Sequence, residues 1–445
     1  MRVRLEALGC RLNTGEIERV GRQFVAAGHQ VAGPDEPFDV CIINTCAVTQ
    51  IATRKSRQLI RRLQHGHPSA AFVVTGCYAQ LEPAQAAALG VHLVAGNQQK
   101  EQLVELVVER FGRRDGASPA VVPYLYQEAD HRPSREDGLR LVPGAHTRAF
   151  VKVQDGCDNA CAFCVVRLAR GAARSRGAAD VLDEVRQLTG MGCREVVVCG
   201  VHLGSYGHDR GDRQGLFHLV SMLLRDTDIP RVRLSSLEPW DLDADFFRLW
   251  DQGRRLGRHL HLPLQSGCDA TLRRMGRRTT GRDFAALVSA ARDAIPDLSV
   301  TTDVMVGFPG ESEMEFAESM AFVEAMEFAR LHIFRYSPRP GTRAASMPDQ
   351  VPSAVAAGRS QQMRQTGARM EHAFRARFAG RTMEVLWETG TPQGNGWLWD
   401  GLTENYLRVV APGGSALRNV ITPTRLLADT GDGLRGEILG AEGGG

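Results

Sequence analysis

The sequence lacks any uninterrupted apolar run approaching the roughly 20 residues that a membrane-spanning helix needs, which argues against a helical membrane protein. Its N-terminal stretch, MRVRLEALGC, also lacks the longer apolar core and the small-residue cleavage site of a secretory signal. The composition, with 43% hydrophobic and 24% charged residues, is that of a globular protein. We therefore expect a cytoplasmic protein with no membrane partner.

Net charge is also small. A formal charge of +3 does not by itself indicate a nucleic-acid partner, although positive charge can still be concentrated on one face. The only lysines are Lys55, Lys100 and Lys152, so arginine carries nearly all of the basic count, as a genome-wide codon preference would produce. At 445 residues the chain exceeds the size of most single cores, which predicts two or three domains.

Residues 1–111 alternate short apolar runs with amphipathic segments, a pattern typical of an open α/β domain with a parallel sheet. The predicted strands are the runs RVRLEAL, DVCIINT, AAFVVTG and VHLVAG. Cys10, Cys46 and Cys77 each stand just past the C-terminal end of one of the first three strands, at the edge where ligands collect in such sheets.

These three cysteines allow two interpretations. They share one metal, or they are three unrelated buried thiols. A shared metal is favoured because each cysteine holds the same place in its own βα unit and follows a small residue, namely Gly9, Thr45 or Gly76. Cys41 lies inside the second strand and is assigned to the core.

Residues 112–147 contain Gly, Pro, Asp and Arg without periodicity and are predicted to form a linker. A second series of strands and helices fills residues 148–372, and its repeats predict a partial (β/α)6 barrel whose working face lies at the strand C-termini. The predicted barrel strands are FVKVQ, REVVVCGV, RVRLSS, HLHLPL, LSVTTDVMVGF and ARLHIFRYS.

Residues 375–440 form short β-like segments between Gly-rich turns, which predicts a small all-β barrel, and 441–445 are predicted to be a disordered tail. Two roles stay open for the aromatic residues of this barrel: they stack on RNA beside arginines such as Arg408, Arg418 and Arg425, or they fill the core. These aromatic residues are Trp387, Trp397, Trp399 and Tyr406.

Cys157, Cys161 and Cys164 form a C-x3-C-x2-C pattern just after the first barrel strand. Thiolates are ligands for zinc and for iron–sulfur clusters, but no fourth Cys or His lies nearby to close a structural zinc site. A [4Fe–4S] cluster held by three cysteines leaves one iron open for the amino and carboxylate groups of S-adenosylmethionine (SAM). An electron from such a cluster cleaves SAM to a 5′-deoxyadenosyl radical.

This triplet, with Phe163 before its last cysteine, resembles the signature of the radical-SAM superfamily. The domain order further resembles the methylthiotransferases, whose C-terminal barrel is called a TRAM domain and binds tRNA. The resemblance covers essentially the whole chain, through LGCRLN, INTCAVT, VTGCYAQ, ARGAARSR, DVMVGFPGE and YSPRPGT. It implies that Cys10, Cys46 and Cys77 hold a second [4Fe–4S] cluster. One departure is Arg167, where the family usually has proline.

The family acts on tRNA carrying isopentenyladenosine, on tRNA carrying N6-threonylcarbamoyladenosine, or on a ribosomal-protein aspartate. The stretches RVRLSSLEPWDL and HLPLQSGCDATLRRMGRR, with Cys268, are most similar to the threonylcarbamoyladenosine branch. The rival hypotheses are the same chemistry on another acceptor, and a non-catalytic iron–sulfur electron carrier or RNA-binding protein. Cys268 marks the branch and is expected to be a packed loop thiol.

The resemblance implies a reaction beside the anticodon in which one SAM methylates sulfur at the N-terminal cluster and a second SAM is cleaved at the barrel cluster. The radical removes the hydrogen of adenine C2, where methylthio is delivered. An electron donor of the flavodoxin or ferredoxin type is implied as a partner. Besides the cluster cysteines, the candidate contacts to SAM or substrate are Phe163, Gly200, Ser235, Ser236, Gln265 and Asp303.

Most of these candidates end barrel strands, so ordinary strand-end polar residues remain the alternative. Arg170, Arg174 and Arg176 are candidates for SAM carboxylate or RNA phosphate, unless they belong to a solvated basic loop. The segment Arg54–Arg62 predicts a basic helix face suited to an anionic tRNA. Three histidines, His202, His259 and His261, are either ligands or strand histidines satisfied within the core, and the core role is the expectation.

Overall fold

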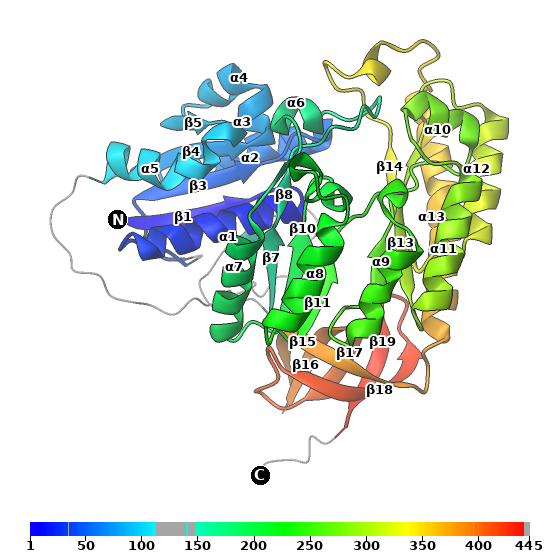
Figure 1. Ribbon diagram of the computed structural model, residues 1–445. Helices are drawn as coiled ribbons and strands as arrows, with labels where there is room; N and C mark the ends of the chain where they lie inside the picture. Colours follow the sequence, from blue (N-terminus) through cyan, green and yellow to red (C-terminus); the bar gives the residue numbers. More distant parts are fainter. Residues whose placement is uncertain (34, 113–138, 141–146, 395, 440–445) are drawn as a thin grey trace. The chain divides into compact units, whose positions relative to one another are not determined.

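A computed structural model describes the chain except for residues 34, 113–138, 141–146, 395 and 440–445 (Figure 1). Most of the predicted linker and the whole predicted tail therefore lie outside the described residues. Leu139 and Arg140, inside the predicted linker, form the short strand β6, which pairs antiparallel with β1 (Arg2–Ala7). The domain boundaries inferred from the sequence stay a prediction.

The described chain divides into two compact units. The first comprises Met1–His146, Phe150–Asp158 and Cys164–Ala173, and the second comprises Thr147–Ala149, Asn159–Phe163 and Arg174–Gly445. The loop that carries Cys157, Cys161 and Cys164 thus contributes to both units, and each unit is described by itself below.

The first unit is built on a sheet with the strand order β2-β1-β3-β4-β5, in which every one of these neighbouring pairs is parallel. Its further strands are β2 (Gln30–Val31), β3 (Val40–Thr45), β4 (Ala71–Gly76), β5 (Leu93–Ala95) and the short β8 (Gln154–Asp155). Its helices are α1 (Arg11–Ala26), α2 (Gln50–Gly66), α3 (Cys77–Leu81), α4 (Pro83–Ala87), the 3-10 helix Asn97–Gln102, α5 (Leu103–Phe111) and α6 (Val166–Arg170).

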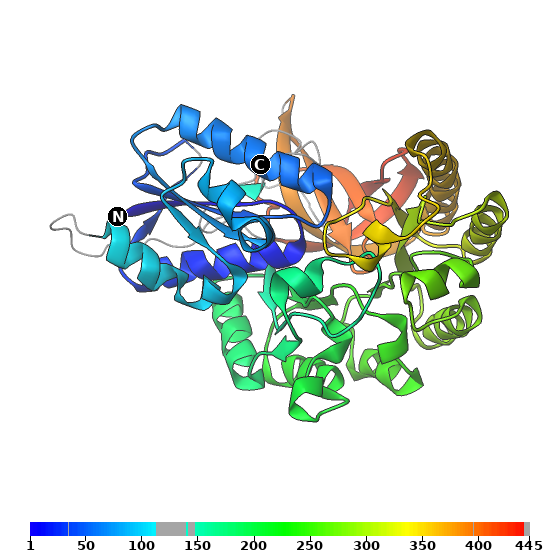
Figure 2. The same ribbon diagram turned by 90° about the horizontal axis from the view of Figure 1, so that it is seen from above.

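Helices cover both faces of this sheet, as Figure 2 shows for the blue and cyan part of the chain. Phe24 of α1 and Val107 of α5 pack on one face, while Ile60 of α2 and Tyr78 of α3 pack on the other. All six residues of β3 are buried, because a central parallel strand is covered on both sides. The α/β fold predicted for the N-terminal region is confirmed.

Two three-stranded sheets, in the orders β7-β10-β11 and β12-β13-β14, form most of the strands of the second unit, and β7 begins in this unit and continues into the first. Two isolated parallel bridges, Val232 with Leu256 and Ser236 with His261, connect the β11 and β12 segments, so the strands follow one another as in a partial (β/α)6 barrel. The strands are β7 (Arg148–Lys152), the short β9 (Arg174–Ser175), β10 (Glu195–Cys199), β11 (Arg231–Leu234), β12 (His259–His261), β13 (Ser299–Val306) and β14 (Arg330–Arg335).

Helices follow the strands of this partial barrel, as the sequence periodicity predicts. Capping boxes at Thr280 with Asp283, and at Ser312 with Glu315, fix the starts of two of them, because each side chain satisfies a backbone N–H at the helix end. The α-helices are α7 (Ala178–Gly190), α8 (Gly215–Asp226), α9 (Ala244–Phe247), α10 (Asp269–Met275), α11 (Gly281–Ala294), α12 (Glu313–Ala325) and α13 (Ser353–Ala376). The 3-10 helices span Leu203–Ser205, His208–Arg210, Pro239–Asp241, Arg248–Gln252 and Arg343–Ser346.

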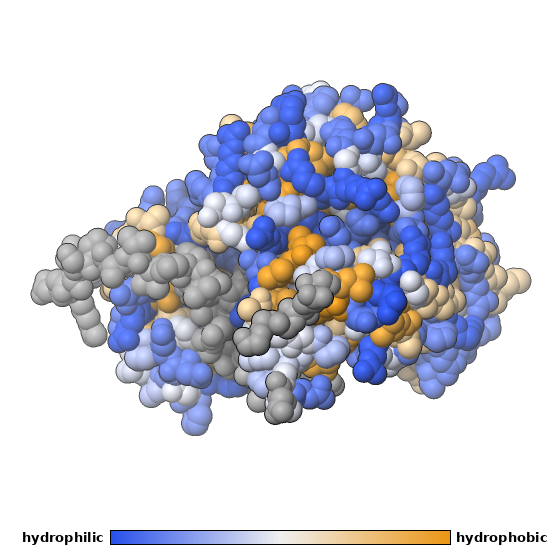
Figure 3. Space-filling model, turned by 90° about the horizontal axis from the view of Figure 1, so that it is seen from below, coloured by the Kyte–Doolittle hydropathy of each residue, from blue (hydrophilic) through white to orange (hydrophobic). Residues whose placement is uncertain are grey.

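The second unit ends in a closed barrel with the strand order β15-β16-β17-β19-β18, which confirms the small all-β barrel. Trp387 and Trp399 are buried in its core, so these two aromatic residues fill the barrel. Figure 3 shows the molecule from below, with apolar side chains in several places among hydrophilic ones. The strands are β15 (Thr382–Gln393), β16 (Gly396–Thr403), β17 (Arg408–Gly413), β18 (Ile421–Asp429) and β19 (Leu434–Ile438).

Tyr406 lies between the small barrel and the strands of the (β/α)6 barrel. Its ring stacks on His259 with centroids 4.7 Å apart, and the Arg233 guanidinium lies 4.4 Å from the ring centroid. Arg233 is fully buried and donates two hydrogen bonds of 3.0 Å to Glu195, and others to the backbone oxygens of Thr403 and Glu404. Tyr406 and these charges therefore join the two barrels within this unit.

Replacing Glu195 by glutamine is expected to lower the free energy of unfolding by about 3–5 kcal/mol at pH 7, because buried arginines then lose their carboxylate partner. Burial alone would raise the pKa of Glu195, but Arg233 and Arg231 lower it from 4.5 to about 2. Since this pKa is depressed in the folded state, the contribution is complete above pH 4.5 and is lost as the pH falls toward 2.

Urea unfolding at pH 7 and at several pH values below 4.5 measures this effect. The difference between wild type and Glu195→Gln should shrink as the pH falls. The matched control is Asp245→Asn, which removes an exposed ion pair with Arg248 and is expected to cost less than about 0.5 kcal/mol. A Glu195 variant as stable as the control would contradict the expected role of the pair.

Candidate cluster and cofactor sites

Cys10, Cys46 and Cys77 lie at one edge of the first sheet. In the parallel register Ala7 pairs with Asn44 and Thr45 pairs with Gly76, so β1, β3 and β4 end at the same level. Cys10 immediately precedes α1 and Cys77 is the first residue of α3. The structure therefore brings together the three thiols that the sequence places at successive strand ends.

Two glycines make this convergence possible. A Cβ on Gly9 would lie 2.5 Å from the Cβ of Cys46 and 2.8 Å from its Sγ, and Gly9 has a φ of +113°. A Cβ on Gly76 would lie 2.3 Å from the backbone oxygen of Thr45, at a φ of +98°. Both positions combine a left-handed backbone with a close approach, which only glycine satisfies.

The three thiols also interact electrostatically. Burial raises the pKa of the Cys46 thiol to about 12, and the neighbouring charges of Cys10 and Cys77 add to this rise while Arg170 opposes it. Thiolates that repel one another in this way are stabilised when they coordinate a metal, since metal binding deprotonates thiols. Three thiols are the donor type of an iron–sulfur cluster, in which each thiolate binds a different iron.

The cysteine loop that follows β8 makes contacts within each of the two units. In the first unit the Cys157 N–H donates to the oxygen of Gly171 at 3.0 Å, and the Val166 N–H donates to the Sγ of Cys164 at 3.4 Å. In the second unit the Ala162 N–H donates to the oxygen of Met275 at 2.8 Å, and the Phe163 ring meets Phe308 edge-on at 6.5 Å. Phe163, which belongs to this loop, is therefore packed against Phe308.

Sequence reasoning missed Arg277, which lies beside Cys161. One Nη of Arg277 lies 3.9 Å from the Cys161 Sγ, and the guanidinium donates two hydrogen bonds to Glu238 and one to the oxygen of Pro263. The face of the guanidinium stacks 4.5 Å from the Trp240 ring centroid. Arg277 lies in the run GRR, within a stretch that resembles the threonylcarbamoyladenosine branch. No local pattern connects it with Cys161, which is 116 positions away.

The predicted SAM contacts Gly200, Ser235 and Ser236 lie just after β10 and β11, at the C-terminal ends of these strands. Ser235 is buried, and its hydroxyl has no hydrogen-bond partner within the described residues, which leaves it available to a ligand. Gln265 has a φ of +73° and its backbone joins β13 at Val304.

Asp303 lies within β13 and faces His261, with 3.3 Å between its Oδ1 and the histidine Nε2. His259 bonds Thr301 at 2.9 Å in the core, as expected for a strand histidine. His202 pairs with Asp241 through one ring nitrogen, and Asn159 of the cysteine loop lies 3.3 Å from the other. A histidine that the sequence assigned to the core thus contacts the cysteine loop.

Arg170 differs from the expectation of a solvated or phosphate-binding arginine. It is buried and pairs with Glu16 and Asp155 inside the first unit. Arg174 is exposed, and Arg176 bonds Glu184 at 2.7 Å. On α2, Arg54, Arg61 and Arg62 are exposed, so that helix presents the basic face expected from the sequence.

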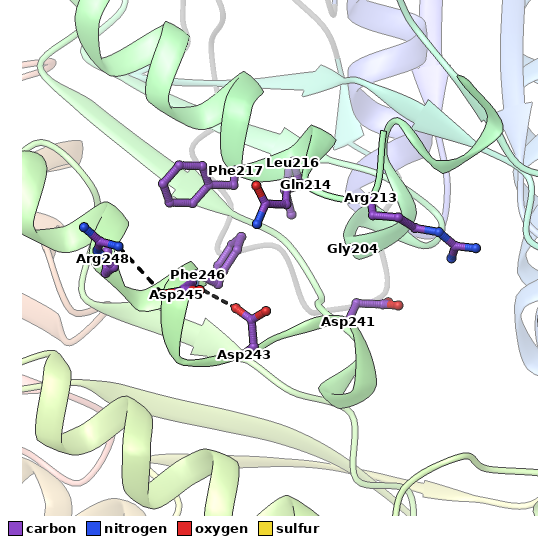
Figure 4. Close-up of a pocket in the computed structure, with 10 residues that line it drawn as sticks. All are labelled: Gly204, Arg213, Gln214, Leu216, Phe217, Asp241, Asp243, Asp245, Phe246 and Arg248. Atoms are coloured by element: carbon purple, nitrogen blue, oxygen red, sulfur yellow. Dashed lines mark hydrogen bonds and ion pairs between the residues drawn. The ribbon is translucent and has the colours of Figure 1, made fainter. Parts of the chain in front are cut away.

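A pocket of about 180 Å³ lies between α8 and α9 in the second unit (Figure 4). Its lining includes three aspartates and two arginines, and Asp245 is paired with Arg248 at 3.7 Å. None of the predicted cluster or SAM residues lines it. We therefore do not assign the cofactor site to this pocket.

Within the described residues, no three His, Cys, Asp or Glu side chains are grouped closely enough to hold a single metal ion. All ten cysteines lie in the described parts, and none forms a disulfide. No helix in the described parts of the chain has both the length and the apolar character of a membrane-spanning segment.

Comparisons with known proteins agree with this architecture. The Radical SAM superfamily matches residues 151–323, and the Uncharacterized protein family UPF0004 matches residues 2–96. Among solved structures, a radical S-adenosylmethionine methyltransferase, TsrM from Kitasatospora setae, superposes with a TM-score of 0.52 at 15% identity. That alignment covers 74% of this chain and 66% of the other. The fold and the cysteine loop thus define a radical-SAM enzyme, and its class implies SAM and a [4Fe–4S] cluster.

The curated relatives narrow the class. A threonylcarbamoyladenosine tRNA methylthiotransferase, MtaB from Bacillus subtilis, is 35% identical over 432 residues, which are 96% of this chain and 93% of the relative. A tRNA-2-methylthio-N(6)-dimethylallyladenosine synthase from Thermobifida fusca is 35% identical over 85% of this chain and 76% of its own length. The chain belongs to the radical-SAM tRNA methylthiotransferase family.

Proposed function

We propose that the protein installs a methylthio group at C2 of N6-threonylcarbamoyladenosine next to the anticodon of tRNA, with two SAM molecules and two [4Fe–4S] clusters. The observation that carries this proposal is the 35% identity over 96% of the chain to a relative named for that substrate. The stretches RVRLSSLEPWDL and HLPLQSGCDATLRRMGRR, which resemble that branch, support it further.

We assign the SAM-cleaving cluster to Cys157, Cys161 and Cys164, and the second cluster to Cys10, Cys46 and Cys77. Each set supplies three thiols and leaves one iron for a substrate. When bound, the SAM-cleaving cluster supplies the electron that cleaves SAM and so starts the radical chemistry at the adenine carbon. A side-chain base does not remove this hydrogen in the proposal, because the C–H bond is too weakly acidic for ordinary proton transfer.

The residues around the cysteine loop have orienting roles in this proposal. Arg277 directs an N–H toward Cys161, and the backbone N–H of Val166 donates to Cys164, so both stabilise thiolate charge. The buried hydroxyl of Ser235 is available to SAM at the strand ends. The other proposed contacts to SAM or substrate rest on their positions at or near the ends of barrel strands, and these are Gly200, Ser236, Gln265 and Asp303. The proposal includes a cytoplasmic setting and an electron donor of the flavodoxin or ferredoxin type.

Mass spectrometry of nucleosides from total tRNA tests the function. The gene is expressed in a host that lacks its own methylthiotransferases, and 2-methylthio-N6-threonylcarbamoyladenosine is expected to appear. Methylthio on isopentenyladenosine alone would keep the chemistry and reject the branch assignment. Methylthio on neither nucleoside would reject the tRNA acceptor proposed here. An empty vector and the Cys157→Ser variant are the controls.

A further inference from the structure

Five charged side chains are buried together in the first unit, beside the N-terminal cysteines. We call them the Glu16 charge cluster, and its members are Glu16, Lys100, Lys152, Asp155 and Arg170. Arg170 donates to Glu16 at 2.8 Å and to Asp155 at 2.9 Å. Lys152 lies 3.0 Å from Glu16 and 3.1 Å from Asp155, and Lys100 also pairs with Glu16.

Three formal cations against two carboxylates leave one positive charge in this cluster. No member has more than 14% of its side chain exposed, and Arg170 has only 2%. A buried charge is costly unless something nearby compensates it. Although burial opposes its charge, Glu16 and Cys77 hold the pKa of Arg170 well above its ordinary value. The surplus positive charge therefore calls for a negative partner.

Two asparagines connect Arg170 and its helix with the cysteines. The Arg170 guanidinium donates to the side-chain oxygen of Asn13 at 2.9 Å, and this oxygen lies 3.9 Å from the Cys10 Sγ. Asn97 donates to the backbone oxygen of Ala169 at 2.7 Å, and the same nitrogen lies 3.9 Å from the Cys77 Sγ. The end of α6 is thus one side chain away from two of the three thiols.

We infer that Arg170 balances the charge of the iron–sulfur cluster at Cys10, Cys46 and Cys77, and so holds its midpoint potential above the value it would have beside a neutral residue. The inference rests on the second cluster of the proposed function. Reduction by an external donor adds one electron, and hence one negative charge, to the cluster. A buried cation stabilises that reduced form more than the oxidised form, because the surroundings screen little.

The alternative is a purely structural role, in which Arg170 only closes the buried ion pairs that hold α6. The two roles differ in what they require of the side chain. Charge balance requires the cation and tolerates lysine, whereas the structural role depends on the forked guanidinium that reaches Glu16, Asp155 and Asn13 at once.

The test uses the full-length chain with Cys157, Cys161 and Cys164 replaced by alanine, so that iron binds only at the N-terminal site. This parent protein is reconstituted anaerobically, and its midpoint potential is measured by dithionite titration followed by electron paramagnetic resonance. Arg170→Met and Arg170→Lys are compared in this background. Arg167→Met is the matched control, because Arg167 lies on the same helix but is exposed.

Arg170→Met is expected to shift the potential to a more negative value, or to lose iron that Arg170→Lys retains. Arg170→Lys and Arg167→Met should stay near the parent value. An unchanged potential in Arg170→Met, or an equal shift or loss of iron in Arg170→Lys, would overturn the inference. A parent protein that binds no iron through Cys10, Cys46 and Cys77 would instead overturn the second cluster of the proposed function.

Discussion

Serine at Cys157 is expected to abolish both the formation of 5′-deoxyadenosine and the methylthiolation of tRNA. A serine hydroxyl is a far poorer iron ligand than a thiolate, and the loop has no spare cysteine with which to replace it. The SAM-cleaving cluster then fails to form. The purified, reconstituted protein is incubated with SAM and dithionite, and 5′-deoxyadenosine is quantified by liquid chromatography.

The control for this loss is Cys193→Ser. Cys193 is buried and its thiol donates to the oxygen of Glu195 at 3.2 Å, a bond that a hydroxyl can also make. This variant should produce 5′-deoxyadenosine at close to the wild-type level. Undiminished cleavage of SAM by Cys157→Ser would remove Cys157 from the proposed site, and its absence from the wild type as well would favour a non-catalytic iron–sulfur protein.

Serine at Cys46 is expected to separate the two halves of the reaction. Methylthiolation should be lost, because the proposed sulfur-bearing cluster needs Cys46, while 5′-deoxyadenosine continues to form at the other cluster. Iron content should fall from about eight to about four atoms per chain, as expected for the loss of one of two [4Fe–4S] clusters. Iron analysis, nucleoside mass spectrometry and 5′-deoxyadenosine quantification on one preparation measure all three effects.

Cys41→Ser is the matched control for that experiment, since Cys41 lies five residues earlier, in β3, and is fully buried in the core. It should retain both activities and the full iron content. Loss of 5′-deoxyadenosine in Cys46→Ser would show that the N-terminal cysteines support the cleavage step itself. Full iron content in Cys46→Ser would show that Cys46 is not a ligand.

The strand-end cysteines were predictable because the information is local and the topology repeats it. Each of Cys10, Cys46 and Cys77 follows a short run that the pattern predicts to be a strand, and parallel strands end at one edge of a sheet. The small residues before them also carried a signal. Gly9 and Gly76 proved necessary for the close approach of the loops, as the contacts of their absent Cβ atoms show.

The charged partners were not predictable in the same way. Arg170 and Glu16 are separated by 154 positions, and neither lies in a pattern that distinguishes a buried ion pair from a solvated charge. Arg170 appeared in a basic stretch and was expected to meet a ligand or water. Only the fold shows that it is buried among carboxylates, because such pairings depend on tertiary packing rather than on local periodicity.

Tyr406 illustrates the same limit in the C-terminal barrel. The sequence allowed RNA stacking or core packing for this residue, and it gave no sign that the ring would lie against Arg233 and His259. Its φ of +71° places it in a tight turn between β16 and β17, and a tyrosine side chain does not predict such a backbone conformation.

This joint has a consequence for protein engineering. Moving the C-terminal barrel into a relative would transfer Tyr406 and the carbonyl groups of Thr403 and Glu404, but would leave their arginine partners behind in this chain. A chimera that moves the barrel alone would leave the buried guanidinium group of Arg233 without these backbone acceptors. An exchange of this barrel therefore has to carry Glu195, Arg231 and Arg233 along with it.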